Sequence, residues 1–442
     1  MKKSYWICCL LALTLTTMTA FETAHVSKIE KISDPESGKL LTDWIDVHLK
    51  LIRATKGLSQ GGIFRHQGYA SIAVYETIIG GEKGYLTLAG QLQGLAPVPA
   101  IASDKKVCWQ AGANAAMASV LSSFYSASPV AHKIDSLENH YQGVFERNGF
   151  SSESIKSGAE YGASVAAHIL AWAKEDGSAK TWPAYEIPKG DGLWEPTPPG
   201  FSAPAAPYAY NNRTCVKNST ANTLPVPPTK FSADAGSTFY AMVDEVYQTS
   251  LKLTDAEKSM ALFWDDFPDG KYYGAGGHWA SIFKQIVPQK QLSLMTGTVA
   301  YVKMNISLMD AFNATWKGKY TYNVLRPVTY IQKHMSHADW NPLIVTPAHP
   351  EYPAAHASVS MAAATALTNA LGDNVAFTDH TYDDLGFAPR AFKSFNDAGR
   401  EAGLSRLYGG IHYRPSIEAG YLVGSKTASN VLNGVSFRKK GV

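Results

Sequence analysis

Basic side chains in the last third of the chain are spaced in a way that would let them hold an anion. Lys319 and Arg326 stand seven residues apart, almost two helical turns, in the segment WKGKYTYNVLRPVTYI. We therefore expect both cations on one face of a single helix, which Pro327 would end or kink. Two cations on the inward face of an apolar helix require an anion. Two solvated charges on an outer helix face are the alternative.

A histidine follows at the point where the stretch 347–373 changes from a proline-rich loop to a run of small residues typical of a helix. His356 comes directly after Pro353, Ala354 and Ala355. The first turn of a helix has unpaired backbone N–H groups at the positive end of the dipole, and small side chains let an anion reach them. An imidazole there could exchange a proton with a bound group. A buried helix whose histidine caps or packs is the alternative.

The third group lies in the segment SRLYGGIHYRPSIEAG. Arg406 would close one helix, Gly409 and Gly410 would break it, and His412 would stand near the start of the next. An unbroken helix would place Arg406 and His412 on different faces, whereas a turn at the double glycine lets both aim at one point. Arginine is suited to two-point contact with a tetrahedral oxyanion.

Taken in order, the three segments resemble a known family pattern. The chain has Lys-x6-Arg-Pro, Pro-Ala-Ala-His and Ser-Arg-x5-His. Type 2 phosphatidic acid phosphatases and vanadium-dependent haloperoxidases share Lys-x6-Arg-Pro, Pro-Ser-Gly-His and Ser-Arg-x5-His-x3-Asp. The stretches FWDDFPDG, GGHW and LMDAFNATWKGKYTYNVLRP look like the soluble haloperoxidase branch. The resemblance implies an all-α fold of two packed helical bundles of vanadium haloperoxidase type with long irregular loops.

The resemblance also implies a role for each matching position. Lys319, Arg326 and Arg406 would hold the equatorial oxygens of vanadate or phosphate, together with the backbone N–H of Ala355. His412 would be the axial ligand of vanadium, or the nucleophile of a phosphatase. His356 would be the acid–base residue. Trp316 and His349 match positions that flank the halide or peroxide side of haloperoxidase sites.

Two positions depart from the family pattern. Ala354 stands where the family has serine, so one hydroxyl donor to the oxyanion is lost, worth about 1.5–3 kcal/mol. Ser416 stands where the phosphatases have the aspartate that activates their nucleophilic histidine. Unless Glu418 or another acid substitutes, His412 would be a poor nucleophile but still a competent vanadium ligand.

These departures favour a vanadate-dependent haloperoxidase that oxidises halide with hydrogen peroxide. A soluble acid phosphatase that acts on small phosphate esters is the alternative enzyme. An oxyanion-binding relative without catalysis is the alternative from another class. The acidic residues Asp265, Asp266 and Asp269 lack EF-hand spacing, and we interpret them as capping a helix end.

The composition, the N-terminal segment and the cysteines limit the class of protein and its expected location. The chain has 442 residues, 45% hydrophobic and 17% charged, with a net charge of +3 and no basic stripe, so nucleic acid is not an expected partner. The segment 1–24 is typical of a signal peptide, which predicts export to the periplasm or outside the cell. No later stretch is apolar enough to span a membrane. Cys108 and Cys215 remain after processing, and the sequence leaves open both their pairing and the oligomeric state.

The helical pattern divides the chain. Apolar residues recur at helical spacing from 40 to about 177 and again from about 237 onward. Between them, 181–228 is rich in proline, glycine and asparagine and predicts a long irregular connector. We therefore expect an N-terminal helical region at 25–235 that includes this connector, and a catalytic helical domain at 236–437.

Overall fold

The computed structural model describes residues 31–267 and 270–439. The predicted signal peptide at 1–24 therefore lies outside the described residues. Within them, no helix is both long and apolar enough to cross a bilayer.

The prediction of an all-α fold is confirmed. The described part of the chain contains thirteen α-helices and two short strands, joined by loops and short 3-10 helices. The helices are α1 Gly38–Ala54, α2 Gln60–Ile78, α3 Trp109–Tyr125, α4 His132–Arg147, α5 Ser152–Lys174, α6 Thr238–Leu251, α7 Asp255–Phe263, α8 Gly274–Gln289, α9 Leu294–Tyr322, α10 Pro327–His334, α11 Ala355–Leu371, α12 Phe395–Tyr408 and α13 Arg414–Gly434. The strands β1 (Phe377–Asp379) and β2 (Arg390–Phe392) pair antiparallel.

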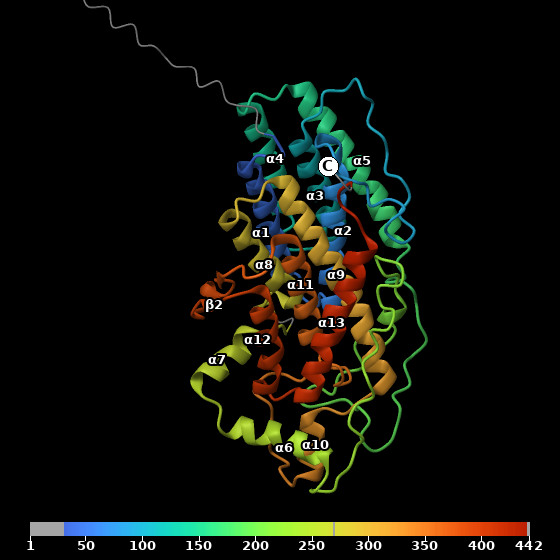
Figure 1. Cartoon of the computed structure of the whole chain (residues 1–442), viewed down its shortest axis with the longest axis vertical. Coiled ribbons are helices and arrows are strands. Elements are labelled where there is room, and N and C mark those ends of the chain that lie inside the picture. The colour runs from blue at the N-terminus through green and yellow to red at the C-terminus, as the bar shows by residue number, and fades with distance from the viewer. Residues whose placement is uncertain (1–30, 268–269, 440–442) are drawn as a thin grey trace, which may run out of the picture.

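The N-terminal helices pack into one bundle around α2, α3 and α5 (Figure 1). Glycines let α3 and α5 approach closely, because a Cβ on Gly162 would lie 2.0 Å from the Gly112 carbonyl oxygen. Serines cap two of these helices: Ser59 accepts from the N–H of Gly62 at the start of α2, and Ser151 does the same for α5.

The C-terminal helices pack around α11, which contacts α9, α12 and α13. Helix α9 has 29 residues and also packs against α2, so it belongs to the contacts of both sets (Figure 1). The main hydrophobic core is continuous across them, with buried side chains such as Ile72, Leu308 and Leu367. The loop that follows α9 and the loop that precedes α11 are therefore both attached to one rigid, closely packed core.

The connector 181–228 is irregular, as predicted, apart from one short 3-10 helix at Ala209–Asn211. It runs back along α9 and is held there by side chains of that helix. Trp316 and Tyr320 donate to the carbonyl oxygen of Ala205, at 3.3 and 2.6 Å. Asp310, fully buried, accepts from the N–H of Cys215 at 2.6 Å. The connector thus becomes part of the wall beside the predicted site.

Cys108 and Cys215 form no disulfide. Both are buried and free, and Cys215 Sγ lies 3.6 Å from the sulfur of Met309. Burial raises the pKa of the Cys108 thiol to about 11, so it stays protonated at neutral pH.

Candidate active site

Lys319 and Arg326 meet at one site, but the prediction that they share one helix face is wrong. Helix α9 ends at Tyr322, because Asn323 adopts a left-handed conformation with φ of 47°. Arg326 is then the N-cap of α10, and Pro327 fills the first helical position. The two cations converge because the chain turns between them.

Both cations are fully buried and held by backbone carbonyl groups. Lys319 Nζ donates to the carbonyl oxygens of Pro350 and Glu351, at 2.7 and 3.0 Å. Arg326 donates from Nε to the His349 carbonyl oxygen and from Nη1 to that of Ile411, both at 2.9 Å. Burial, reinforced by Arg326, lowers the pKa of Lys319 well below its usual value, and burial lowers that of Arg326 to about 10.

A carboxylate that the motif comparison missed orients His412. Glu351 Oε1 lies 2.7 Å from His412 Nδ1 and accepts from the N–H of Tyr413 at 3.0 Å. On the other side of the ring, Arg326 Nη1 lies 3.2 Å from His412 Nε2. A carboxylate faces Nδ1 and a guanidinium donor faces Nε2, so the proton belongs on Nδ1 and Nε2 presents its lone pair.

The expected consequence of Ser416 is therefore corrected: Glu351 replaces the missing aspartate. Glu418, the substitute considered from the sequence, is exposed. Burial raises the pKa of Glu351 to about 7, although Arg326 and Lys319 oppose the rise. Burial and the same two cations lower the pKa of His412 well below its usual value, which keeps the imidazole neutral.

His356 stands in the first turn of α11, as predicted, and its partner is also one that the sequence did not reveal. Asp266 Oδ2 lies 3.2 Å from His356 Nδ1, and Asp266 Oδ1 lies 3.6 Å from Arg406 Nη1. The interpretation of this acidic cluster as a simple helix cap is therefore wrong for Asp266, while Asp269 lies outside the described residues. His356 Nε2 is buried and has no hydrogen-bond partner in the described part of the chain.

Arg406 links the two histidines electrostatically. It is buried in the last turn of α12, where Nη2 donates to the carbonyl oxygen of Trp264. As predicted, the chain then turns at the double glycine, with Gly410 at φ of 77°, before α13 begins at Arg414. Burial first and then the Arg406 charge lower the pKa of His356, against the effect of Asp266, and Arg406 also disfavours protonation of His412.

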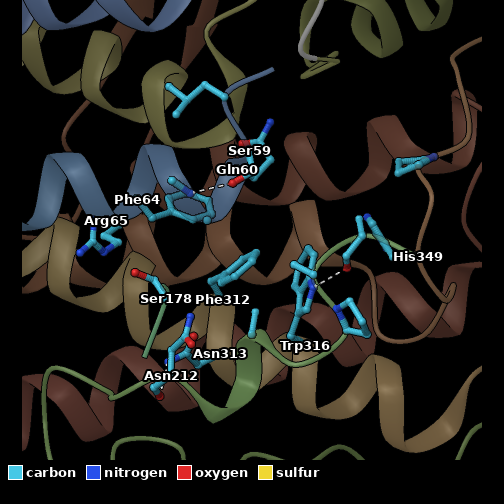
Figure 2. A pocket seen from close by; sticks show the side chains of 18 of the residues that line it. Ser59, Gln60, Phe64, Arg65, Ser178, Asn212, Phe312, Asn313, Trp316 and His349 are labelled. Atoms are coloured by element: carbon cyan, nitrogen blue, oxygen red, sulfur yellow. Dashed lines mark hydrogen bonds between the residues drawn. The ribbon is translucent and has the colours of Figure 1, made fainter. Parts of the chain in front are cut away.

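A cavity of about 830 Å³ opens beside these residues. Its lining includes Arg406, His349 and Trp316, with the ring centroids of the last two 5.0 Å apart (Figure 2). These are the two positions predicted to flank the halide or peroxide side. The cavity is also lined by α2 and the connector, so the N-terminal half contributes directly to the site.

The group as a whole fits a small tetrahedral oxyanion. Lys319, Arg326 and Arg406 bring three basic groups to this region, where Asp266 contacts His356 and Arg406, and Glu351 contacts His412. The N-cap Ala354 has no side-chain bond to the amides of α11, so its first-turn N–H groups, Ala355 included, add donors. The lone pair of His412 Nε2, which faces Arg326, and the unpaired Nε2 of His356 complete a set of groups suited to vanadate or phosphate.

Solved structures identify the family. A crystal structure of a bacterial vanadium-dependent iodoperoxidase superimposes with a TM-score of 0.84 and 32% sequence identity, over 93% of this chain and 99% of that one. The chain belongs to the vanadium-dependent haloperoxidases. Residues 299–439 match the family model of the second helical-bundle domain of vanadium chloroperoxidase.

More distant members of this haloperoxidase family share the fold. Holo and apo crystal structures of a bacterial vanadium-dependent chloroperoxidase give TM-scores of 0.68 and 0.67, each at 14% identity. They cover 87% and 86% of this chain, and 93% and 95% of their own chains. A search of curated proteins finds no match. The link to the phosphatases rests on the motifs alone.

Proposed function

We propose that the protein oxidises halide with hydrogen peroxide at a vanadate bound to His412. The observation that carries this proposal is the His412 ring, fixed at Nδ1 by Glu351 and directed at Nε2 toward the cationic region. A neutral imidazole with an oriented lone pair is the form that a metal ligand needs.

The roles of the other residues follow from their charges and contacts. Lys319, Arg326 and Arg406 hold the oxygen atoms of the anion and offset its charge, together with the N–H of Ala355. Bound vanadate supplies the Lewis acidity that activates hydrogen peroxide toward attack by halide. The buried, carbonyl-bonded position of Lys319 keeps its ammonium fixed, so its donors need no reorganisation during the reaction.

His356 handles the proton that the reaction consumes. Halide, hydrogen peroxide and one proton give hypohalous acid and water. His356 Nε2 is free to pass a proton into the site, while Asp266 holds Nδ1 and stabilises the imidazolium. Trp316 and His349 form the wall from which halide approaches, because both line the cavity next to Arg406.

Iodide is the first halide to test, because the relative with 32% identity is an iodoperoxidase. The assay follows triiodide formation by purified mature protein with peroxide and iodide, before and after orthovanadate is added to phosphate-free apo-protein. Bromination of monochlorodimedone tests bromide in parallel. We expect turnover only with vanadate, lost in His412→Ala and retained in His380→Ala, which removes an exposed histidine paired with Asp383. Turnover that survives His412→Ala would refute the proposal.

Phosphate-ester hydrolysis is the second candidate, and the Glu351 contact favours it. A carboxylate 2.7 Å from Nδ1 would activate His412 as a nucleophile, which removes the objection raised by Ser416. The same preparation is therefore tested with para-nitrophenyl phosphate. Hydrolysis that needs both His412 and Glu351, without halide oxidation, would replace the first proposal. Tight vanadate binding without either reaction would indicate an oxyanion-binding relative.

A further inference from the structure

The cavity extends from Arg406, Ile411 and His349 at the edge of the anion site along α9 into the N-terminal half. Aromatic rings form its middle section. Phe312 lies between Phe64 and Trp316, with ring centroids 5.7 and 4.0 Å away, and Trp182 and Tyr208 stack at 5.0 Å. Figure 2 shows Phe64, Phe312 and Trp316 between His349 on one side of the hollow and Arg65 on the other. Halide and peroxide alone do not need an aromatic section of this kind.

The end away from His349 carries an excess of positive charge. Arg65 donates from Nε to Asp176 and from Nη2 to the Ala173 carbonyl oxygen, which leaves Nη1 without an acceptor among the described residues. Arg213 lies 4.2 Å from the Trp172 ring and donates to the carbonyl oxygen of Trp172 at 2.9 Å. Both arginines line the cavity together with Asp176, whereas the other two acids of the lining, Asp265 and Asp266, interact with Arg406.

These groups sum to about one net positive charge. Burial opposes ionisation, but hydrogen bonds from Ser178 and the charge of Arg65 hold the pKa of Asp176 below its usual value. His66 also lines this end, and burial lowers its pKa to about 3, so it is neutral near pH 7. Two guanidinium groups thus face one carboxylate, and an anionic ligand group would balance the remainder.

The cavity mouth is apolar as well. Phe267 and Val345 line it and are 40% and 42% exposed. Large hydrophobic side chains left in water at a cavity mouth favour the entry of an organic molecule.

We propose that this cavity binds the organic acceptor of the oxidised halogen, an electron-rich aromatic compound with an anionic group. The ring lies against Phe64, Phe312 and Trp316, and the anionic group lies at Arg65 and Arg213. The ring is thereby held next to the anion site, where hypohalous acid forms. This inference rests on the proposed function for its reaction, but the binding site itself does not require vanadate.

The transfer step needs no further reactant. The ring carbon attacks the halogen of hypohalous acid, a carbon–halogen bond forms, and the halogen–oxygen bond breaks. The ring proton and the hydroxide leave as water. Peroxide has already oxidised the halide by two electrons, so the sum is acceptor, hydrogen halide and peroxide giving halogenated acceptor and two water molecules.

Calorimetric titration of vanadate-free protein with two matched probes tests the binding site. 6-Hydroxy-2-naphthoate carries the anionic group, and 6-hydroxy-2-naphthamide has the same ring without the charge. We expect the naphthoate to bind about tenfold more tightly. The preference should shrink in Arg65→Met, grow in Asp176→Asn, and return near the original value when both changes are combined. Arg147→Met, at an exposed arginine of α4, is the control and should change neither affinity.

The inference would be overturned by equal affinities for the two probes, or by a preference for the naphthoate that stays the same in Arg65→Met and in Asp176→Asn. It would also be overturned by a product isomer ratio from the loaded enzyme, bromide and naphthoate identical to that from free hypobromous acid. The triiodide assay uses no organic acceptor, and the calorimetric titration uses no vanadate. A failure of halide oxidation and a failure of acceptor binding are therefore distinguished.

Discussion

Replacing Asp266 by asparagine should move the basic limb of the pH–activity profile toward lower pH. Asp266 Oδ2 lies 3.2 Å from His356 Nδ1, and its negative charge favours the imidazolium. At about 4 Å and an effective dielectric constant near 20, a pair of unit charges interacts by about 4 kcal/mol. Because the Asp266 side chain is 23% exposed, solvent reduces this to roughly 1–2 kcal/mol, about a tenfold change in proton affinity.

The sign follows from which form the carboxylate stabilises. Without it, burial and Arg406 act unopposed, so the pKa of His356 falls further. If protonated His356 delivers the proton, activity is lost about one pH unit earlier as pH rises. The asparagine can still accept from Nδ1–H, so the ring position is retained.

Two measurements check this expectation. An NMR titration of His356 in vanadate-free protein reports its proton affinity directly, and iodide oxidation across pH reports the functional limb. Asp265→Asn is the matched control, because Asp265 is the adjacent acid but does not contact His356. An unchanged or higher pKa of His356 in Asp266→Asn, or the same change in Asp265→Asn, would refute the reasoning.

Three further predictions concern stability and anion affinity. Burial lowers the pKa of His48 to about 3, so between about pH 6.5 and 3 the unfolded chain binds one more proton at this residue, and the free energy of unfolding should fall by about 1.4 kcal/mol for each pH unit that the pH drops. Other buried histidines such as His66 add slopes of their own, so His48→Gln should reduce the total slope by about this amount in urea titrations at several pH values. Gly424→Ala should lower the free energy of unfolding by more than about 2 kcal/mol, because the added Cβ would lie 1.9 Å from the Ser358 carbonyl oxygen where α13 packs against α11. Gly143→Ala is the control: its Cβ would meet only the flexible end of an arginine side chain, so thermal unfolding should show α4 slightly stabilised. Ala354→Ser should tighten vanadate binding about tenfold or more in equilibrium dialysis by adding a hydroxyl donor, and unchanged affinity would show that the hydroxyl caps α11 instead.

The sequence predicted the parts of the site that depend on local rules. Helix α11 begins at Ala355, where proline punctuation gives way to small residues. The chain turns at Gly410 between Arg406 and His412, because glycine accepts a positive φ that other residues resist. The same rules gave a wrong prediction between Lys319 and Arg326. Their spacing fits one continuous helix, but the left-handed conformation of Asn323 ends α9 between them.

The carboxyl groups that contact the two histidines could not be found in this way. Glu351 stands 61 positions from His412, and Asp266 stands 90 positions from His356. A single acid within an apolar, proline-rich loop was the only signal for Glu351, and it did not indicate a partner. Pairings at such separations depend on how helices pack, which periodicity along the chain does not encode.

The amino-acid sequence by itself therefore determined the helical class, the family pattern and the three segments that carry cations and histidines. These features depend on contacts within a few residues and on side-chain chemistry. Only the tertiary structure decided which carboxylate orients which imidazole and which atom of each ring is free. It also decided that the N-terminal half and the connector line the cavity. Burial, charge balance and enclosure arise only when segments distant in the sequence pack together.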